Sequence, residues 1–349
     1  MQYKKKLFFS LLISVVLITA CSQNTKGIEK NSHLNDSLQA VQLEQHRLDS
    51  TKAVHKKFLP ENIVLEKEFL YDKHTLEDVY PYKDTTRKFQ WEKIRVYLAL
   101  IDSMQSQPSQ WGILKNRKNV NGEAPLAENV SRNAYGNMED EFGIERYQGI
   151  PFYFSSDTTV VERYGLDGSL IKIINDNDSS SKFITIWHPA TKGEWKVPRK
   201  YVKYISDTAF FQKTAFVDRH NQNITTIEKK NDKWLIRSMN PATTGVHRPP
   251  YMHETPLGIF VLQEKKVKMI FLKDGSTATG GFAPYASRFC NGGYIHGVPV
   301  NAPRKTLIEY SSSLGTTPRS HMCVRNATSH AEFFFNWAPL ENALVIVLE

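Results

Sequence analysis

The chain has 349 residues, a formal net charge of +9, 40% hydrophobic residues and three cysteines. This composition excludes an intrinsically disordered chain and a small disulfide-stapled scaffold, and the length predicts two or three domains. In chain order, we expect an α+β protein with a helical N-terminal region, a small β-barrel-like middle module and a β-rich C-terminal domain.

Residues 1–20 have the pattern of a secretory signal peptide. Three lysines precede an apolar run over 7–20, which is too short to cross a bilayer as a helix. The run ends in Ile18-Thr19-Ala20-Cys21, which resembles the bacterial lipobox, where cleavage leaves an acylated cysteine as the N-terminus. We therefore expect a mature chain of net charge +6 that begins at a lipidated Cys21. The alternative is a chance cysteine beside an ordinary cleavage site.

A lipidated Cys21 would make the membrane a partner of this protein and place it in the cell envelope. Ser22 follows the cysteine and no acidic run comes after it. By analogy with lipoprotein sorting, this favours the periplasmic face of an outer membrane. We expect no nucleic-acid partner, because the sequence has no basic stripe with interleaved aromatic residues.

Residues 21–60 are expected to form a lipid-anchored polar tether and a stalk helix. Four apolar residues recur there at heptad-like spacings, namely Leu34, Leu38, Val41 and Leu48. A lone amphipathic helix that lies on its own domain is the alternative.

Residues 61–147 are predicted to be a helical region of unknown role. One core-facing helix is expected from Asp84 to Met104, and it carries Phe89, Ile94, Leu98 and Ile101 on one face.

Residues 148–206 are predicted to be a small β module. Short β-type runs, such as 170–174 and 183–187, alternate there with Gly, Asp, Asn and Ser, which is typical of a small barrel. The stretch from Gly193 to Val202 resembles the closing strands of bacterial Src-homology-three-like modules. Trp187 and Trp195 are interpreted as core residues, with a glycan-binding platform as the alternative.

Residues 207–349 are predicted to be a β-rich domain with one late helix. Strands are expected at 215–218, 223–228 and 234–239, and a helix is expected at about 329–337, with Ser329 and Glu332 in a capping box. The run 343–348 is apolar on both faces, which predicts a buried strand.

The chemistry centres on Cys323, which follows His296 by 27 residues. A thiol attacks as the thiolate, so at neutral pH it needs an imidazole, a cation or a helix N-terminus nearby. His296 or His321 can accept the proton, Arg325 adds positive charge, and a helix is expected after Asn326. The backbone N–H groups of Met322 and Cys323 could form an oxyanion hole.

Two motifs resemble the L,D-transpeptidase catalytic-domain family. They are Tyr294-Ile295-His296-Gly297 and Ser320-His321-Met322-Cys323-Val324-Arg325, in the order that this family uses. Papain-like peptidases place the cysteine before the histidine, and sortase-like enzymes have their histidine much further upstream. Further blocks agree over about 211–349: Thr244-Gly245, Thr255-Pro256-Leu257-Gly258-Ile259-Phe260, an aromatic lid from Pro284-Tyr285 to Arg288-Phe289, and the helix Ala331-Glu332-Phe333-Phe334.

The resemblance implies roles for these residues. Cys323 would be the nucleophile and His296 the general base, oriented by the backbone carbonyl of Gly297. His321 and Ser320 would shape the pocket, and Arg325 would support the site or face a substrate carboxylate. Tyr294 and Tyr285 are further candidates for substrate contact or support. The implied reaction is peptidoglycan L,D-transpeptidation on stem peptides, without cofactor or metal, and Cys323 would be open to acylation by carbapenems.

The sequence departs from the family pattern at three places. Met322 replaces a glycine, so the backbone should differ locally if that position needs a positive φ. An insertion is expected near 304–313, and His330 stands where an acid is usual. These departures keep open an L,D-carboxypeptidase or wall amidase that uses water as acceptor, and a non-catalytic peptidoglycan-binding lipoprotein.

Two alternatives concern the cysteines and histidines. Cys323 could be a structural thiol, and Cys290 could be a small buried thiol, a redox partner of Cys323 or an exposed thiol. A metal site built from His253, His296, His321 and His330 is a further alternative, although no HExxH or CxxC spacing supports it.

Overall fold

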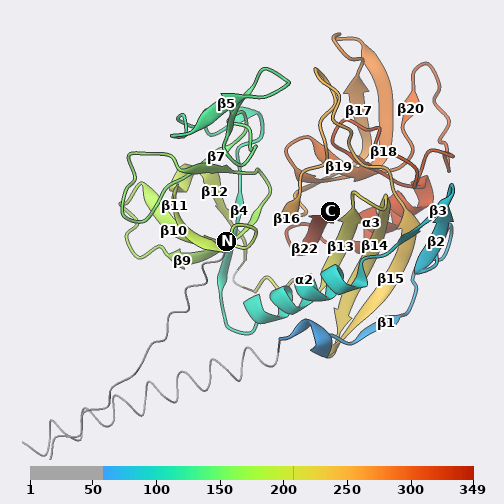
Figure 1. Ribbon diagram of the computed structural model, residues 1–349, viewed down its shortest axis with the longest axis horizontal. Coiled ribbons are helices and arrows are strands. Elements are labelled where there is room, and N and C mark those ends of the chain that lie inside the picture. The colour runs from blue at the N-terminus through green and yellow to red at the C-terminus, as the bar shows by residue number, and fades with distance from the viewer. Residues whose placement is uncertain (1–57, 207) are drawn as a thin grey trace, which may run out of the picture. The chain divides into compact units, whose positions relative to one another are not determined.

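A computed structural model describes residues 58–206 and 208–349 (Figure 1). The predicted signal peptide, Cys21 and the stalk helix lie outside the described residues. No helix within the described ranges has the length and apolar character needed to span a membrane.

The elements of the described chain are mostly short strands. The helices are η1 (Pro60–Asn62), α2 (Trp91–Met104), η2 (Arg117–Asn119), η3 (Arg199–Tyr201) and α3 (Thr328–Trp337), where η marks a 3-10 turn. The strands are β1 (Leu65–Lys67), β2 (Val79–Tyr82), β3 (Thr85–Lys88), β4 (Gln110–Leu114), β5 (Val130–Arg132), β6 (Met138–Asp140), β7 (Ile150–Phe152), β8 (Arg163–Gly165), β9 (Leu170–Asn175), β10 (Phe183–His188), β11 (Gly193–Pro198), β12 (Val202–Tyr204), β13 (Lys213–Asp218), β14 (Asn223–Lys230), β15 (Lys233–Pro241), β16 (Gly258–Val261), β17 (Glu264–Leu272), β18 (Thr279–Cys290), β19 (Gly293–His296), β20 (Val300–Asn301), β21 (Val324–Arg325) and β22 (Ala343–Leu348).

A six-stranded sheet forms the base of the C-terminal domain, in the order β1-β15-β14-β13-β22-β16. β22 pairs with β13 in parallel and with β16 antiparallel, so both of its edges are hydrogen bonded. All six of its residues are buried, which confirms the predicted strand that is apolar on both faces. The strands expected at 215–218, 223–228 and 234–239 are also confirmed as parts of β13, β14 and β15.

Helices cover both faces of this sheet. α2 packs on one face, where Ile94, Leu98 and Ile101 join a core with Phe216 of β13 and Ile346 of β22. These three residues recur at intervals of three and four, so they share one side of the helix. α3 and the second sheet of the domain cover the other face, as Figure 1 shows.

The late helix expected at about 329–337 is confirmed as α3, but its predicted cap is not. The residue before its first turn is Ala327, and no side chain caps it. Ser329 instead hydrogen bonds to the Tyr71 hydroxyl (2.7 Å) and to the carboxylate of Glu309, so the predicted capping box with Glu332 is wrong. Long-range partners satisfy the serine in place of the local cap.

The second sheet carries the residues of interest, in the order β17-β18-β19-β21, with β20 paired to β18. β18 is its long central strand, and the turn at 273–278 joins it to β17. The segment from Pro284 to Phe289 lies within β18, so the aromatic lid predicted there is in fact part of the sheet.

A five-stranded sheet, β11-β10-β9-β4-β12, forms the middle module. The strands expected near 170–174 and 183–187 are present as β9 and β10. β4 pairs with β9 and β12 although it precedes the expected start at residue 148. Trp195 packs against the rings of Phe152 and Phe154, in line with a core role.

The prediction that 61–147 is helical is wrong. α2 is the only α-helix in this stretch, and it begins at Trp91 because residues 85–88 form β3. β1 pairs in parallel with β15 at the edge of the six-stranded sheet, and the pairs β2-β3 and β5-β6 form hairpins. Strands of three or four residues are too short to give a periodic pattern, which explains the error.

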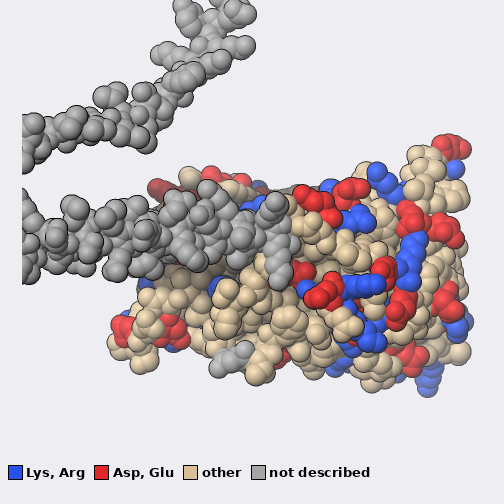
Figure 2. All heavy atoms as spheres, turned by 90° about the horizontal axis from the view of Figure 1, so that it is seen from below, with Lys and Arg blue, Asp and Glu red and all other residues tan. Residues whose placement is uncertain are grey.

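Charged side chains of both signs are intermixed on the face seen in Figure 2. Ion pairs also join segments that are distant in sequence, such as Lys229 with Asp102 and Lys203 with Glu341. The exposed pair of Lys203 with Glu341 contributes little to stability by itself.

Candidate active site

The site is built where β19 and β21 run side by side in parallel, with Ile295 opposite Val324 and His296 opposite Arg325. Side chains alternate between the two faces of a strand. Cys323 packs against Tyr294, so these two residues share a face, and His296 and Arg325, each two residues further on, share it too. The two predicted motifs therefore meet on one face of the sheet.

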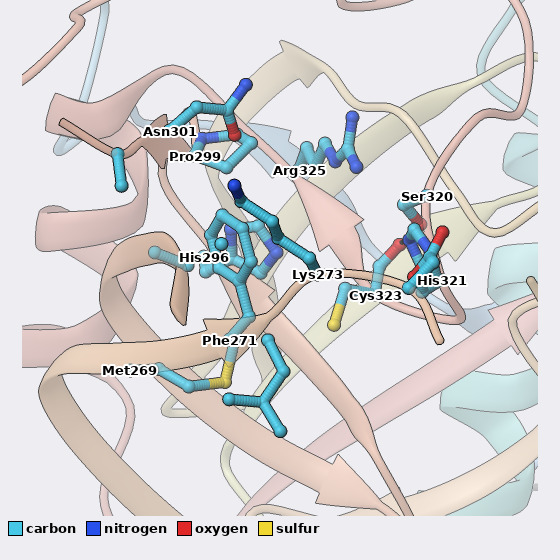
Figure 3. A pocket seen from close by; sticks show the side chains of 15 residues that line it. Met269, Phe271, Lys273, His296, Pro299, Asn301, Ser320, His321, Cys323 and Arg325 are labelled. Atoms are coloured by element: carbon cyan, nitrogen blue, oxygen red, sulfur yellow. Dashed lines mark hydrogen bonds and ion pairs between the residues drawn. The ribbon is translucent and has the colours of Figure 1, made fainter. Parts of the chain in front are cut away.

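A cavity of about 580 Å³ lies over this face (Figure 3). Its lining includes His296, Ser320, His321, Cys323 and Arg325. The structure therefore brings five of the predicted site residues to one cavity. Their individual chemical roles remain predictions.

His296 is held in one orientation by its neighbour. Its Nδ1 donates a hydrogen bond to the Gly297 carbonyl at 2.6 Å, which leaves Nε2 as the acceptor. Burial lowers the pKa of His296 to about 4, so the imidazole is neutral at pH 7. A Cβ on Gly297 would lie 2.7 Å from Thr328 Oγ1, so this position has room only for glycine.

Cys323 is a protonated thiol in the resting state. Its Sγ donates to the Gly292 carbonyl at 3.5 Å rather than to His296. Burial raises the pKa of the thiol, although the Tyr294 N–H and the charge of Arg325 act in the opposite direction. Proton transfer to a base must accompany its attack on a substrate.

Two threonine motifs hold the cysteine loop. The Thr255 hydroxyl donates to the Met322 carbonyl (2.8 Å) and accepts from the Gly245 N–H (2.9 Å). Ser320 donates its hydroxyl hydrogen bond to the Cys323 carbonyl. Sequence blocks far apart in the chain thus fix the backbone around the thiol.

Met322 keeps the backbone conformation that favours glycine. Its φ is +78°, so the expectation that the local backbone would differ is wrong. Within the described ranges, its backbone N–H has no hydrogen-bond acceptor. A free N–H beside the thiol suits the predicted oxyanion hole.

The two candidate tyrosines differ in position. Tyr294 supports Cys323 through its ring and its N–H, while its hydroxyl donates to Glu264 at 2.8 Å. Tyr285 lies outside the cavity, with its ring against Phe335 of α3 at 6.0 Å between centroids. Tyr285 therefore does not line this cavity, and its role in substrate contact or support stays a prediction.

The turn at 273–278 covers the cavity and was missed by the sequence analysis. Asp274 in this turn lies 2.9 Å from Nε2 of His321, and both residues line the cavity. Met269 and Phe271 of β17 also line the cavity. No motif marks these residues, because the contact depends on the β17–β18 hairpin folding back over the cysteine loop.

Arg325 lies between two cavities. It lines the main cavity and a second one of about 430 Å³ formed by residues 298–314, which include the predicted insertion. Its guanidinium makes no ion pair with any residue of 58–206 or 208–349, and its Nε is buried without a partner. An anionic group could therefore pair with it.

The remaining cysteine and histidine candidates lie elsewhere. Cys290 is fully buried and unpaired, as expected for a small core thiol. His330 is a core residue whose Nε2 lies 2.9 Å from Ser238 Oγ. Among the described residues, no three His, Cys, Asp or Glu side chains gather as a metal site.

Sequence comparison identifies the family of the C-terminal domain. Residues 212–347 match the family model YkuD, the L,D-transpeptidase catalytic domain. A comparison with curated proteins found no match.

Solved structures similar to this chain include two L,D-transpeptidases and one fused amidase/peptidase. An L,D-transpeptidase from Mycobacterium smegmatis is 14% identical over 53% of this chain and 93% of that one, with a TM-score of 0.33. L,D-transpeptidase 3 from Mycobacterium tuberculosis, in complex with a faropenem-derived adduct, is 16% identical with the same coverages and TM-score. A fused Zn-dependent amidase/peptidase/peptidoglycan-binding protein from Clostridium acetobutylicum is 16% identical over 40% of this chain, with a TM-score of 0.29, and the match spans about half of that protein (53%). These values are too low to support an argument about function.

Proposed function

Because residues 212–347 belong to the L,D-transpeptidase catalytic-domain family, we propose that this protein is a peptidoglycan L,D-transpeptidase with Cys323 as its nucleophile. The observation that carries the proposal is a neutral, oriented His296 in the same cavity as the Cys323 thiol. A neutral imidazole can take the thiol proton, and a buried thiol becomes strongly nucleophilic once it is ionised.

In the first step, the Cys323 sulfur attacks the carbonyl that joins diaminopimelate to the terminal D-Ala of a tetrapeptide stem. The thiol proton passes to Nε2 of His296. The new C–S bond gives a thioester as the C–N bond breaks, and the imidazolium returns the proton to the leaving D-Ala amine. The free N–H of Met322 suits the negative charge that develops on the carbonyl oxygen.

In the second step, an amine of another stem resolves the thioester. The neutral amine attacks the carbonyl, a C–N bond forms and the C–S bond breaks. Nitrogen gives its proton to His296, which returns it to the sulfur, so the resting thiol is restored. The unpaired guanidinium of Arg325 suits a substrate carboxylate beside the reacting carbonyl.

The test uses purified protein and tetrapeptide-containing peptidoglycan fragments. We expect wild-type protein to release D-Ala and to form cross-linked dimers, measured by mass spectrometry. Cys323→Ala should abolish both, whereas Cys290→Ala, the matched control at the other buried thiol, should retain them. Treatment with meropenem should add one adduct to the wild type and none to Cys323→Ala.

The same products separate the rival functions. If the protein forms tripeptide but no dimer, it is an L,D-carboxypeptidase that uses water as acceptor. Unchanged fragments that nevertheless bind the protein would leave a peptidoglycan-binding role. Activity retained in Cys323→Ala would refute the proposed nucleophile.

We also propose that the protein is a lipoprotein of the cell envelope, anchored through Cys21 at the periplasmic face of an outer membrane. The lipobox-like sequence before Cys21 supports this. Fatty-acid labelling of the wild type but not of Cys21→Ala is the expected result, and equal labelling would contradict it.

A further inference from the structure

A second groove reaches the cysteine loop beside the catalytic cavity. It consists of two cavities of about 550 and 460 Å³, both lined by Glu145, His253, Asn291 and Met322. The smaller one is also lined by His321, which lines the catalytic cavity as well. The groove therefore ends at the residues that flank Cys323.

One wall of this groove comes from outside the catalytic domain. It is formed by residues 133–148, which precede the family match at 212–347 and include β6. The Tyr135 hydroxyl donates to the Met252 carbonyl at 2.5 Å, and its ring stacks on His253 with centroids 3.8 Å apart. The wall is thus packed directly against the catalytic domain.

Glu145 is an oriented carboxylate in this wall. It accepts hydrogen bonds from the side-chain amides of Asn133 (2.7 Å) and Asn137 (3.0 Å). Both donors are neutral, and no Lys or Arg of the described chain pairs with Glu145. Among the described residues, the one ion-pair partner of Glu145 is His253, 3.8 Å away, whose pKa is lowered by burial although Glu145 opposes this. The carboxylate therefore keeps an uncompensated negative charge.

Asn291 provides an independent sign that the groove binds a polar ligand. Its side chain is 9% exposed, it lines both cavities, and its Oδ1 is buried without a hydrogen-bond partner. Buried polar atoms in proteins are nearly always paired, so an unpaired one in a groove is suited to a ligand.

We propose that this groove binds the amine-bearing acceptor peptide, with the Glu145 carboxylate pairing to its ammonium group and Asn291 hydrogen bonding to the peptide. The proposal rests on the proposed transpeptidase function and adds a specificity determinant supplied by the segment 133–148. Glu145 recognises the ammonium form. The amine then loses its extra proton to solvent before it attacks the thioester as described above.

The experiment separates the two half-reactions. Donor acylation is measured as D-Ala release from a tetrapeptide stem, and transfer as dimer formation at varied concentrations of a diaminopimelate-containing acceptor peptide. Glu145→Gln should leave D-Ala release unchanged and raise the KM for the acceptor about tenfold or more. Hydroxylamine, which is neutral at pH 7, serves as a second acceptor, and its transfer should be the same in both proteins.

Glu141→Gln is the matched control, because Glu141 is exposed in the same segment and does not line the groove. It should behave as the wild type. An unchanged acceptor KM in Glu145→Gln would overturn the inference, and so would slower D-Ala release without acceptor, since the groove would then hold the donor. If Glu145→Gln lost transfer to hydroxylamine as much as transfer to the peptide, the variant would have a structural defect, and the inference would also be overturned. A wild-type protein that releases no D-Ala would refute the proposed function itself.

Discussion

At the scale of single residues, Met322 has a strained backbone conformation and lies next to the candidate nucleophile Cys323. A side chain in the left-handed region costs about 1–2 kcal/mol, because Cβ approaches the following carbonyl oxygen. The surrounding structure holds the residue there through the Thr255 hydrogen bond to its carbonyl and through the backbone of Gly245, which has no room for a Cβ. The strained turn leaves the Met322 N–H free beside the thiol.

Two substitutions test this account of Met322. Met322→Gly should keep the free energy of unfolding within about 1 kcal/mol of the wild type, because the released strain offsets the lost burial. Met322→Ile should lower it by about 2 kcal/mol, since a β-branched residue fits a positive φ poorly. Urea denaturation measures both. An isoleucine variant as stable as the wild type would mean that the loop relaxes to a negative φ.

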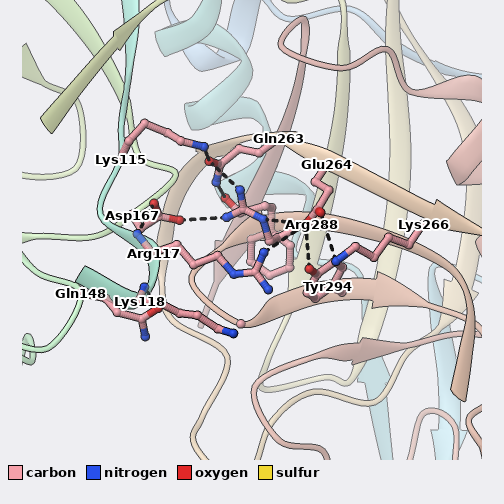
Figure 4. Close-up of polar contacts among 12 residues, drawn as sticks. Lys115, Arg117, Lys118, Gln148, Asp167, Gln263, Glu264, Lys266, Arg288 and Tyr294 are labelled. Carbon is pink, nitrogen blue, oxygen red and sulfur yellow. Dashed lines mark hydrogen bonds and ion pairs between the residues drawn. The ribbon is translucent and has the colours of Figure 1, made fainter. Parts of the chain in front are cut away.

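At the scale of elements, a polar network joins the middle module to the catalytic sheet (Figure 4). Asp167 follows β8 and accepts from the N–H groups of Asn116 (2.9 Å) and Arg117 (3.1 Å), and from Arg288 of β18 (2.9 Å). Burial would raise the pKa of Glu264, but the Tyr294 hydroxyl and other neighbours, which hydrogen bond to it or carry positive charge, lower it to about 2.

Asp167→Asn is expected to lower the free energy of unfolding by about 3–5 kcal/mol. The Asp167 side chain is fully buried and the Arg288 side chain is 6% exposed, so the variant removes the buried counterion of this guanidinium and leaves it with the partly exposed Glu264, whose Oε2 lies 3.3 Å from Nε. Lys233→Ala breaks the exposed pair with Glu66 and should cost less than about 1 kcal/mol. Similar urea midpoints for the two variants would show that Arg288 finds another partner.

Local patterns and long-range contacts differ in how well the sequence predicts them. The long strands β13, β14, β15 and β22 were expected because their β-type runs span four to six consecutive residues, and His296 and Cys323 were found because they stand in recognisable motifs. β1 and β4 were missed, since each depends on pairing with a strand far along the chain. Asp274 and Glu145 reach the site only through tertiary contacts, for which no local pattern exists.

At the scale of the whole molecule, three buried histidines link stability to pH. They lie in the middle module (His188), at the site (His296) and in α3 (His330). Burial lowers the pKa of His188 to about 3, of His296 to about 4 and of His330 to about 3. In the unfolded chain a histidine titrates near about 6.5.

These pKa values predict that the protein loses stability as the pH falls from about 6.5 towards 4. In this window the unfolded chain binds protons that the folded protein does not. Each buried histidine therefore adds up to about 1.4 kcal/mol per pH unit to the slope of the unfolding free energy against pH. His330→Leu should reduce the slope of unfolding free energy against pH by this amount, whatever its effect on stability at pH 7. Urea denaturation between pH 7 and pH 5 measures both slopes, and carboxylates contribute equally to the two proteins. Parallel slopes would mean that His330 is protonated in the folded core, where Ser238 Oγ would have to accept a hydrogen bond from its Nε2–H.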